Sequence, residues 1–334
     1  MNRPPDSYVT VREDALLQFA IACFEVVGLP RAHAVLISRL LVNCDLRGVR
    51  SHGTRQVNGY CRAFAEGHFN PDPQPRVWRD FGAVVGIEGD GSLGYLPMVK
   101  ATELAVERAQ QYGLGMGTVR SIGHYGAAGN YCRMATAAGC IGFSVQGGQH
   151  GNATGANPKP QLGFFGNPPI CFAIPGGEGP PVILDAATCI LADYQRGPEF
   201  EALFSQIPAA FFKSVGYTAV AALLGGGLAG TTSDSAVSDR WPQATGGGTI
   251  IAIRIDAAAD ETEFCTEVDR MTRDVAATFE PLPGHDRALL PGAIEEELWH
   301  KQRLEGIRFG EMEQKSVREV GKRLGIVPPW EAGA

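Results

Sequence analysis

The sequence has no excess of basic charge and no long hydrophobic run. Its 29 Lys and Arg residues are outnumbered by 36 Asp and Glu residues, which gives a formal net charge of −7. Nucleic-acid-binding proteins usually present a basic face, so we expect no nucleic-acid partner. The longest weakly polar run covers residues 219–230 and is shorter than the ~20 residues that a membrane-spanning helix needs. We therefore also expect no membrane partner.

The eight cysteines form neither a metal-binding nor a disulfide pattern. No two of them are spaced as a C-x(2–4)-C pair, so a thiolate zinc site is not indicated. The chain is large and its first residues, MNRPPDSY, contain no apolar signal core, which argues against a disulfide framework. We expect the cysteines to be small core residues and the protein to be cytoplasmic and without a bound metal.

Familiar catalytic and phosphate-binding motifs are also missing. A P-loop, a G-x-S-x-G turn, an H-E-x-x-H pair and an EF-hand loop are all absent. The string at 225–230, GGGLAG, formally matches the G-x-G-x-x-G dinucleotide fingerprint. It follows a helical pattern and does not open a helix, so a Rossmann site is the weaker alternative. We interpret the string as the end of a helix with a flexible exit.

Helical periodicity is present at both ends of the chain. A capping box from Thr10 to Glu13 predicts the start of the first helix, and Pro71, Pro73 and Pro75 predict a stiff connector. Further helices are expected at about 34–46, 55–65, 293–302 and 311–324. These patterns predict a helical subdomain formed by residues 1–70 plus 290–334, and a mixed α/β core over 71–289.

Strand and helix patterns alternate within the predicted core. We expect strands at 83–87, 115–119, 141–145, 170–174, 182–184 and 249–255, and helices at 97–111, 126–138, 214–224 and 261–279. Residues 147–166 are rich in Gly, Asn and Pro and predict a long irregular loop that carries function.

Two histidines occur in polar turns. His52 lies between two helical patterns and is flanked by Arg47, Arg50 and Arg55, while His124 lies between glycines at a strand-to-helix junction. An imidazole can donate or accept a proton near neutral pH, and a guanidinium group can bind a carboxylate. From position alone, a histidine that only caps a helix or fills a turn is the commoner case.

Three further positions are candidates for ligand binding. Asp185 follows a buried-strand pattern, and ligands gather at the carboxyl ends of strands in open α/β sheets; an N-cap role is an equally open alternative. Lys213 precedes an apolar helical pattern and is a candidate for binding phosphate or for solvating the helix start. His285 lies in a polar turn with no independent evidence for function.

Seven strings stand out in the chain: RSHGTR at 50–55 together with Tyr60, GDGSLG at 89–94, GHYG at 123–126, FAIP at 172–175, LDAAT at 184–188, KSVGY at 213–217 and PGHD at 283–286. They resemble the malate/L-lactate dehydrogenase-like oxidoreductase family, which does not use a Rossmann fold. They occur in family order, and the motifs are most similar to those of 2,3-diketogulonate reductase and ureidoglycolate dehydrogenase.

The resemblance implies a mixed sheet flanked by helices, a homodimer, and the reduction of a small carboxylate substrate by NADH or NADPH. The reaction would be reduction of the C=O of a 2-oxo acid or the C=N of a cyclic imino acid. His52 matches the proton donor of diketogulonate-type members, and His124 matches the base of ureidoglycolate-type members. Arg55 would hold the substrate carboxylate, and Asp185 would belong to the catalytic site. The implied cofactor-binding residues are Val182, Ile183, Leu184, Asp185, Ala186, Ala187, Thr188, Phe212, Lys213, Gly284, His285 and Asp286.

The chain also departs from the family pattern. The segment between Asp185 and Lys213 is short and lacks the usual Trp- and Asp-Gly-containing loop, and a Gly-Thr-Asn-Pro turn is replaced by GNPP at 166–169. These changes motivate an alternative, in which the protein has lost redox activity and serves as a binding protein or as a non-redox acid–base enzyme. The residues leave open the choice between NAD and NADP, and between His52 and His124 as proton donor.

Overall fold

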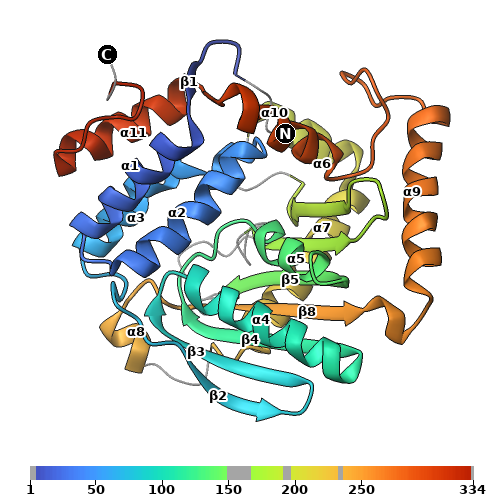
Figure 1. Cartoon of the computed structure of the whole chain (residues 1–334), viewed down its shortest axis with the longest axis horizontal. Helices are drawn as coiled ribbons and strands as arrows, with labels where there is room; N and C mark the ends of the chain where they lie inside the picture. The colour runs from blue at the N-terminus through green and yellow to red at the C-terminus, as the bar shows by residue number, and fades with distance from the viewer. Residues whose placement is uncertain (1–4, 149–166, 191–196, 232–235, 332–334) are drawn as a thin grey trace.

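The computed structural model describes residues 5–148, 167–190, 197–231 and 236–331 (Figure 1). Its strands are β1 (Val9–Val11), β2 (Arg76–Phe81), β3 (Val84–Ser92), β4 (Leu114–Ile122), β5 (Cys140–Gly148), β6 (Pro169–Ile174), β7 (Val182–Ala187), β8 (Gly246–Arg254) and β9 (Ile307–Phe309). Seven of them form one sheet with the order β2-β3-β4-β8-β5-β6-β7, and β1 pairs with β9. Among the described strands, β3 and β4 are the parallel pair and the other pairs are antiparallel. A Rossmann sheet is mostly parallel, so the prediction of a mixed, non-Rossmann sheet is confirmed.

Helices cover both faces of this sheet. They are α1 (Glu13–Val26), α2 (Arg31–Leu46), α3 (Val57–Ala65), α4 (Tyr95–Tyr112), α5 (Gly129–Thr136), α6 (Pro198–Gln206), α7 (Pro208–Ala222), α8 (Ala236–Arg240), α9 (Glu261–Thr278), α10 (Ala293–Glu305) and α11 (Glu311–Leu324). On β5, Gly142 lies against Cys132 of α5, whereas Gly147 lies against Ala222 of α7. Successive strand residues point to opposite faces, so α5 and α7 cover opposite faces.

The two ends of the chain pack together. Figure 1 shows the N-terminal helices and the C-terminal helix α11 side by side above the sheet. One hydrophobic cluster joins Leu16 and Phe24 of α1 to Val317 and Val320 of α11. The strand pair β1–β9 links the same two segments. The exact boundaries of a helical subdomain stay a prediction.

Two predictions about local structure are wrong. Thr10 does not cap a helix: it pairs with Arg308 in the β1–β9 ladder, and α1 begins after Arg12 with no side-chain cap. The helix does end within 225–230, where Gly230 has φ +81° and the N–H of Thr231 donates to the Gly226 oxygen, but the glycines at 225–227 are not a flexible exit. They continue α7 as a π-helical turn, Leu223–Gly227, in which a Cβ on Gly225 would lie 2.4 Å from the backbone carbon of Gln146. Glycine is needed here for close packing on the sheet.

The expected absence of a long apolar segment is also wrong. The helix Pro208–Gly227 has 20 residues and a mean hydropathy of 1.3, so by length and composition it is able to cross a membrane. The run found in the sequence started at residue 219 and therefore left out the first turns of this helix, around Lys213. Thr218, Ala221 and Ala222 of this helix are buried in the protein, and core helices of soluble proteins pass the same test.

The other elements follow the predicted patterns, with some additions. All eight cysteines are free, and Cys189 alone is not fully buried, which confirms their interpretation as core residues. The strands β1, β2 and β9 and the helices α6 and α8 were not predicted. Most of the predicted loop at 147–166 lies outside the described residues, as does the segment 191–196 within the shortened stretch after Asp185.

Candidate active site

A cavity of about 1470 Å³ lies between the helical layer and the β7 edge of the sheet. Its wall combines the turn after α2, the segment between β4 and α5, the end of β5, strand β7, and residues 279–295. Ligand cavities usually measure about 300–1,000 Å³, so this one has room for a ligand larger than a small metabolite.

His52 reaches the cavity from the 3-10 turn Arg50–His52. Its Nδ1 atom lies 2.8 Å from the Ser51 hydroxyl oxygen. The residues that follow this turn are fixed by Asp45. Its Oδ2 atom accepts hydrogen bonds from the backbone N–H of Thr54 (2.8 Å) and from the Thr54 hydroxyl (2.7 Å). Burial, and then the positive charge of Arg55, lower the pKa of His52.

His124 follows β4 and lies beside His52, with the ring centroids 5.4 Å apart. Gly123 before it leaves no space for a Cβ, which would lie 2.2 Å from the Phe69 ring. The Nδ1 atom of His124 lies 2.5 Å from the Tyr60 hydroxyl oxygen. Burial, and then His52, lower the pKa of His124 to about 4. At neutral pH the ring is therefore uncharged.

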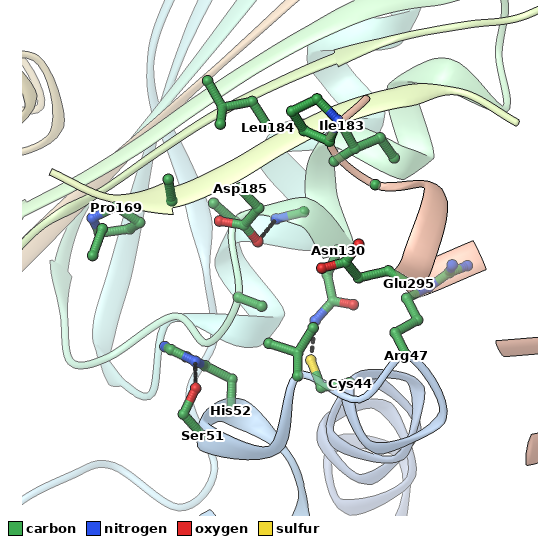
Figure 2. A pocket seen from close by; sticks show the side chains of 18 of the residues that line it. Cys44, Arg47, Ser51, His52, Asn130, Pro169, Ile183, Leu184, Asp185 and Glu295 are labelled. Atoms are coloured by element: carbon green, nitrogen blue, oxygen red, sulfur yellow. Dashed lines mark hydrogen bonds between the residues drawn. The ribbon is translucent and has the colours of Figure 1, made fainter. Parts of the chain in front are cut away.

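Asp185 lies on β7 across the cavity from His52 and Ser51 (Figure 2). Its Oδ2 atom accepts a hydrogen bond of 2.7 Å from the backbone N–H of Gly129, the first residue of α5. Asp185 lies inside β7 and is therefore not an N-cap residue of its own segment; its carboxyl group instead bonds the first N–H of the distant helix α5 and lines the cavity. Although the side chain opens into the cavity, desolvation by the surrounding protein raises its pKa.

Arg55 does not line the cavity among the described residues. Its charge lowers the pKa of His52, so the guanidinium lies near that ring. Three other arginines line the cavity instead: Arg47, which the sequence analysis noted beside His52, and Arg133 and Arg287, which it did not select. Arg47 and Arg133 both form ion pairs with Glu296, and the Arg47–Glu296 distance is 2.7 Å. The side chains come from α2, α5 and α10, and no local motif links them.

The predicted cofactor-binding residues divide into two groups. Those that line the cavity are Ile183, Leu184, Asp185, Ala186, Ala187 and His285. The other predicted residues, all within the described part of the chain, do not line it: Val182, Thr188, Phe212, Lys213, Gly284 and Asp286. Thr188 bonds the backbone oxygen of Pro168, and Phe212 on α7 is 78% exposed.

Sequence reasoning also missed cavity residues that lie outside any motif. Asn130 accepts a hydrogen bond from Asn43 (2.9 Å) and contacts Cys44 of α2. Glu295, near the start of α10, lines the cavity and contributes to the raised pKa of Asp185. Figure 2 shows Asn130, Cys44, Arg47 and Glu295 on one side of the cavity. Their separation in the sequence left no pattern to detect.

The mixed sheet, with two neighbouring histidines in its largest described cavity, defines an α/β protein outside the Rossmann class. Residues 11–195 match the malate/L-lactate dehydrogenase family. This match covers more than half of the chain, and the chain belongs to that family.

Individual relatives are similar over different lengths. A malate dehydrogenase from Pyrococcus abyssi is 32% identical over 56% of this chain and 50% of its own length, so the chain spans about half the length of that relative. An L-sulfolactate dehydrogenase from Methanocaldococcus jannaschii is 27% identical over 90% of this chain and 92% of its own length. The structure of a malate dehydrogenase from Pyrococcus horikoshii has a TM-score of 0.82 and 24% identity, and 98% of each chain is covered. It supports the fold.

Proposed function

We propose that the protein is a nicotinamide-dependent oxidoreductase that reduces the C=O of a small 2-oxo carboxylate, or the C=N of a cyclic 2-imino carboxylate. The observation that carries this proposal is the pair of histidines, His52 and His124, with ring centroids 5.4 Å apart in one large cavity. The reverse reaction is the oxidation of a 2-hydroxy acid, and the named relatives are hydroxy-acid dehydrogenases.

The residues of the cavity fit a bound NAD or NADP. The apolar side chains of Ile183, Leu184 and Ala186 form one wall, and Gly148 has open space where a Cβ would be. When bound, the nicotinamide supplies a hydride. The choice between NAD and NADP depends on residues near the ribose, and both cofactors belong to the proposal.

The chain's own residues supply protons and charge. Reduction leaves negative charge on the substrate oxygen or nitrogen, and an imidazole N–H close to that atom stabilises the charge or donates a proton. The Nδ1 atom of His52 is hydrogen-bonded to the Ser51 hydroxyl, and the Nδ1 atom of His124 is hydrogen-bonded to the Tyr60 hydroxyl. Each ring therefore has Nε2 available for the substrate. We propose that Arg55, which does not line the cavity but acts on His52 through its charge, binds the substrate carboxylate from beside that ring. Asp185 would hold the opposite wall in place through its hydrogen bond to the Gly129 N–H.

Thermal unfolding with NADH and NADPH tests cofactor binding. A ligand at a hundredfold excess over its Kd stabilises the folded state by about 2.7 kcal/mol, so a clear rise in Tm is expected with one or both. Turnover is then measured with a panel of 2-oxo acids and cyclic imines, by the loss of absorbance of the reduced nicotinamide. His52→Ala and His124→Ala should keep the shift and lose turnover. His300→Ala, on the exposed face of α10, serves as the matched control. The absence of a shift with either nucleotide would refute the proposal.

A second candidate is a binding protein or a non-redox acid–base enzyme. It is favoured by Phe212 and Lys213, which are exposed on α7 and are not among the described residues that line the cavity. A thermal shift without oxidation of the nicotinamide by any substrate of the panel would favour this candidate.

We also propose that the protein is a homodimer. The exposed face of α7 carries apolar side chains, among them Phe212, Tyr217, Val220 and Leu223, and large exposed apolar patches often mark interfaces. Light scattering coupled to size-exclusion chromatography measures the mass directly. A monomeric mass at micromolar concentration would contradict this part of the proposal.

A further inference from the structure

The two histidines of the cavity have different hydrogen-bond surroundings. His52 faces Ser51, whose hydroxyl is able to donate or to accept. His124 instead faces a chain of two buried tyrosines: Tyr60 of α3 lies 2.5 Å from its Nδ1 atom, and Tyr95 of α4 lies 3.2 Å from the Tyr60 oxygen. Tyr95 is 0% exposed and Tyr60 is 7% exposed. The difference suggests that the two rings do not perform the same task.

The direction of each hydrogen bond from Tyr95 through Tyr60 to His124 can be assigned. Burial raises the pKa of both Tyr60 and Tyr95, so each phenol keeps its single proton near neutral pH. Among the described residues, Tyr60 is the hydrogen-bond partner found for the Tyr95 hydroxyl. Leaving a buried donor without an acceptor is costly, so Tyr95 donates to Tyr60. Tyr60 then donates to Nδ1 of His124.

This direction fixes the tautomer of the ring. An Nδ1 atom that accepts a hydrogen bond carries no proton, so the proton of neutral His124 lies on Nε2. The opposite direction would need an Nδ1–H that donates to Tyr60, and it would leave the Tyr95 proton unpaired. Gly126 has φ +80°, and a Cβ at this position would lie 2.6 Å from the Tyr95 oxygen. The absence of a side chain at Gly126 thus makes the chain of tyrosines possible.

We propose that Tyr95 and Tyr60 are positioning residues that hold His124 as a neutral Nε2–H hydrogen-bond donor to the reacting C=O or C=N, while His52 supplies the proton. This inference rests on the proposed function. A neutral imidazole can polarise a carbonyl without transferring its proton, as in triosephosphate isomerase. Proton transfer from neutral His124 would instead produce an imidazolate.

The electrons and protons of the proposed reduction can be followed atom by atom. A hydride forms the new C–H bond, and the π electrons of C=O become a lone pair on oxygen. The Nε2–H of His124 stabilises this charge, and the proton of a protonated His52 forms the O–H bond. His52 returns to its neutral form and regains a proton from solvent. The ionisable groups found around His124 are His52, Tyr60 and, through Tyr60, Tyr95.

Nitrogen-15 NMR of the free protein tests the tautomer without any substrate. With labelled histidine, the His124 signals, assigned by their loss in His124→Gln, should show a neutral ring with the proton on Nε2 alone. In Tyr60→Phe the ring should exchange between both tautomers, whereas Tyr8→Phe, at an exposed tyrosine, should change nothing. A proton on Nδ1 in the unmodified protein would overturn the inference, whether or not the protein reduces any substrate.

Kinetics of glutamine variants test the division of roles. A glutamine amide donates a hydrogen bond but cannot transfer a proton. His124→Gln should therefore stay within ~10-fold of the unmodified kcat/KM, while His124→Ala loses ~10²–10³-fold. His52→Gln should lose ~10²–10⁴-fold, the usual contribution of a proton donor. If His124→Gln is as inactive as His124→Ala and His52→Gln is nearly intact, His124 is the proton donor and the inference is wrong. Failure of the unmodified protein with every substrate would instead refute the proposed function.

Discussion

The buried carboxyl group of Asp45 should make the stability of the protein depend on pH. Asp45 is 2% exposed, and burial, as the largest effect, raises its pKa from 3.8 to about 7. The folded protein therefore holds a proton at this site that the unfolded chain has already released. The contribution to stability is fully present below the unfolded pKa of about 4, and it is lost as the pH rises through about 7.

The size of this effect follows from linkage. One unit of pKa difference corresponds to about 1.4 kcal/mol, so the free energy of unfolding should fall by roughly 2–3 kcal/mol between about pH 5 and pH 8 through Asp45 alone. Asp45→Asn keeps an oxygen that accepts from both donors of Thr54 but cannot titrate. Its stability should be less dependent on pH by that amount.

Urea unfolding followed by tryptophan fluorescence measures this dependence at both pH values. Trp299 and Trp330 pack against the helical cluster and report on its unfolding. Asp6→Asn, at an exposed carboxyl group, serves as the control and should keep the pH dependence of the unmodified protein. Equal pH dependence in Asp45→Asn and in the unmodified protein would refute the reasoning.

Two further predictions concern packing and capping. Gly225→Ala should destabilise the protein by about 1–3 kcal/mol, because its Cβ would lie 2.4 Å from the backbone of Gln146. Gly227→Ala should have a much smaller effect, because the nearest atom to its Cβ is 3.8 Å away. The urea midpoints of the two variants measure the difference. Asp185→Ala should cost about 0.5–2 kcal/mol through loss of the cap on the Gly129 N–H, and a retained midpoint would show that the hydrogen bond contributes little.

The predictable part of the fold is the part with strong periodicity. The helices at both chain ends and the central strands carry regular apolar spacing, and the structure contains them within a few residues. Strand β2 was missed because its side chains are exposed, apart from Trp78, so no alternation marks it. Strands β1 and β9 have three residues each and are defined by their pairing with one another.

The candidate site was predictable only where a residue stands in a distinctive local setting. Glycines and arginines marked His52 and His124, and a buried-strand pattern marked Asp185. The partners that set their chemistry come from elsewhere: Tyr60 reaches His124 over 64 residues of sequence. Tyr60 was noted beside the first string of the resemblance, but its contact with His124 depends on how α3 packs in three dimensions, which the sequence does not record.

The position of His52 depends on the C-terminal helices, although none of them contributes a predicted catalytic residue. The Gln302 amide of α10 donates to the backbone oxygens of Asp45 and Leu46, at 3.0 and 2.9 Å, across more than 250 residues of sequence. Those two residues end α2, directly before the turn that carries His52. His124 is held by the sheet and by α3 and α4. Docking of the chain ends therefore helps to place His52 beside His124, and a ligand that contacts both rings should stabilise that docking.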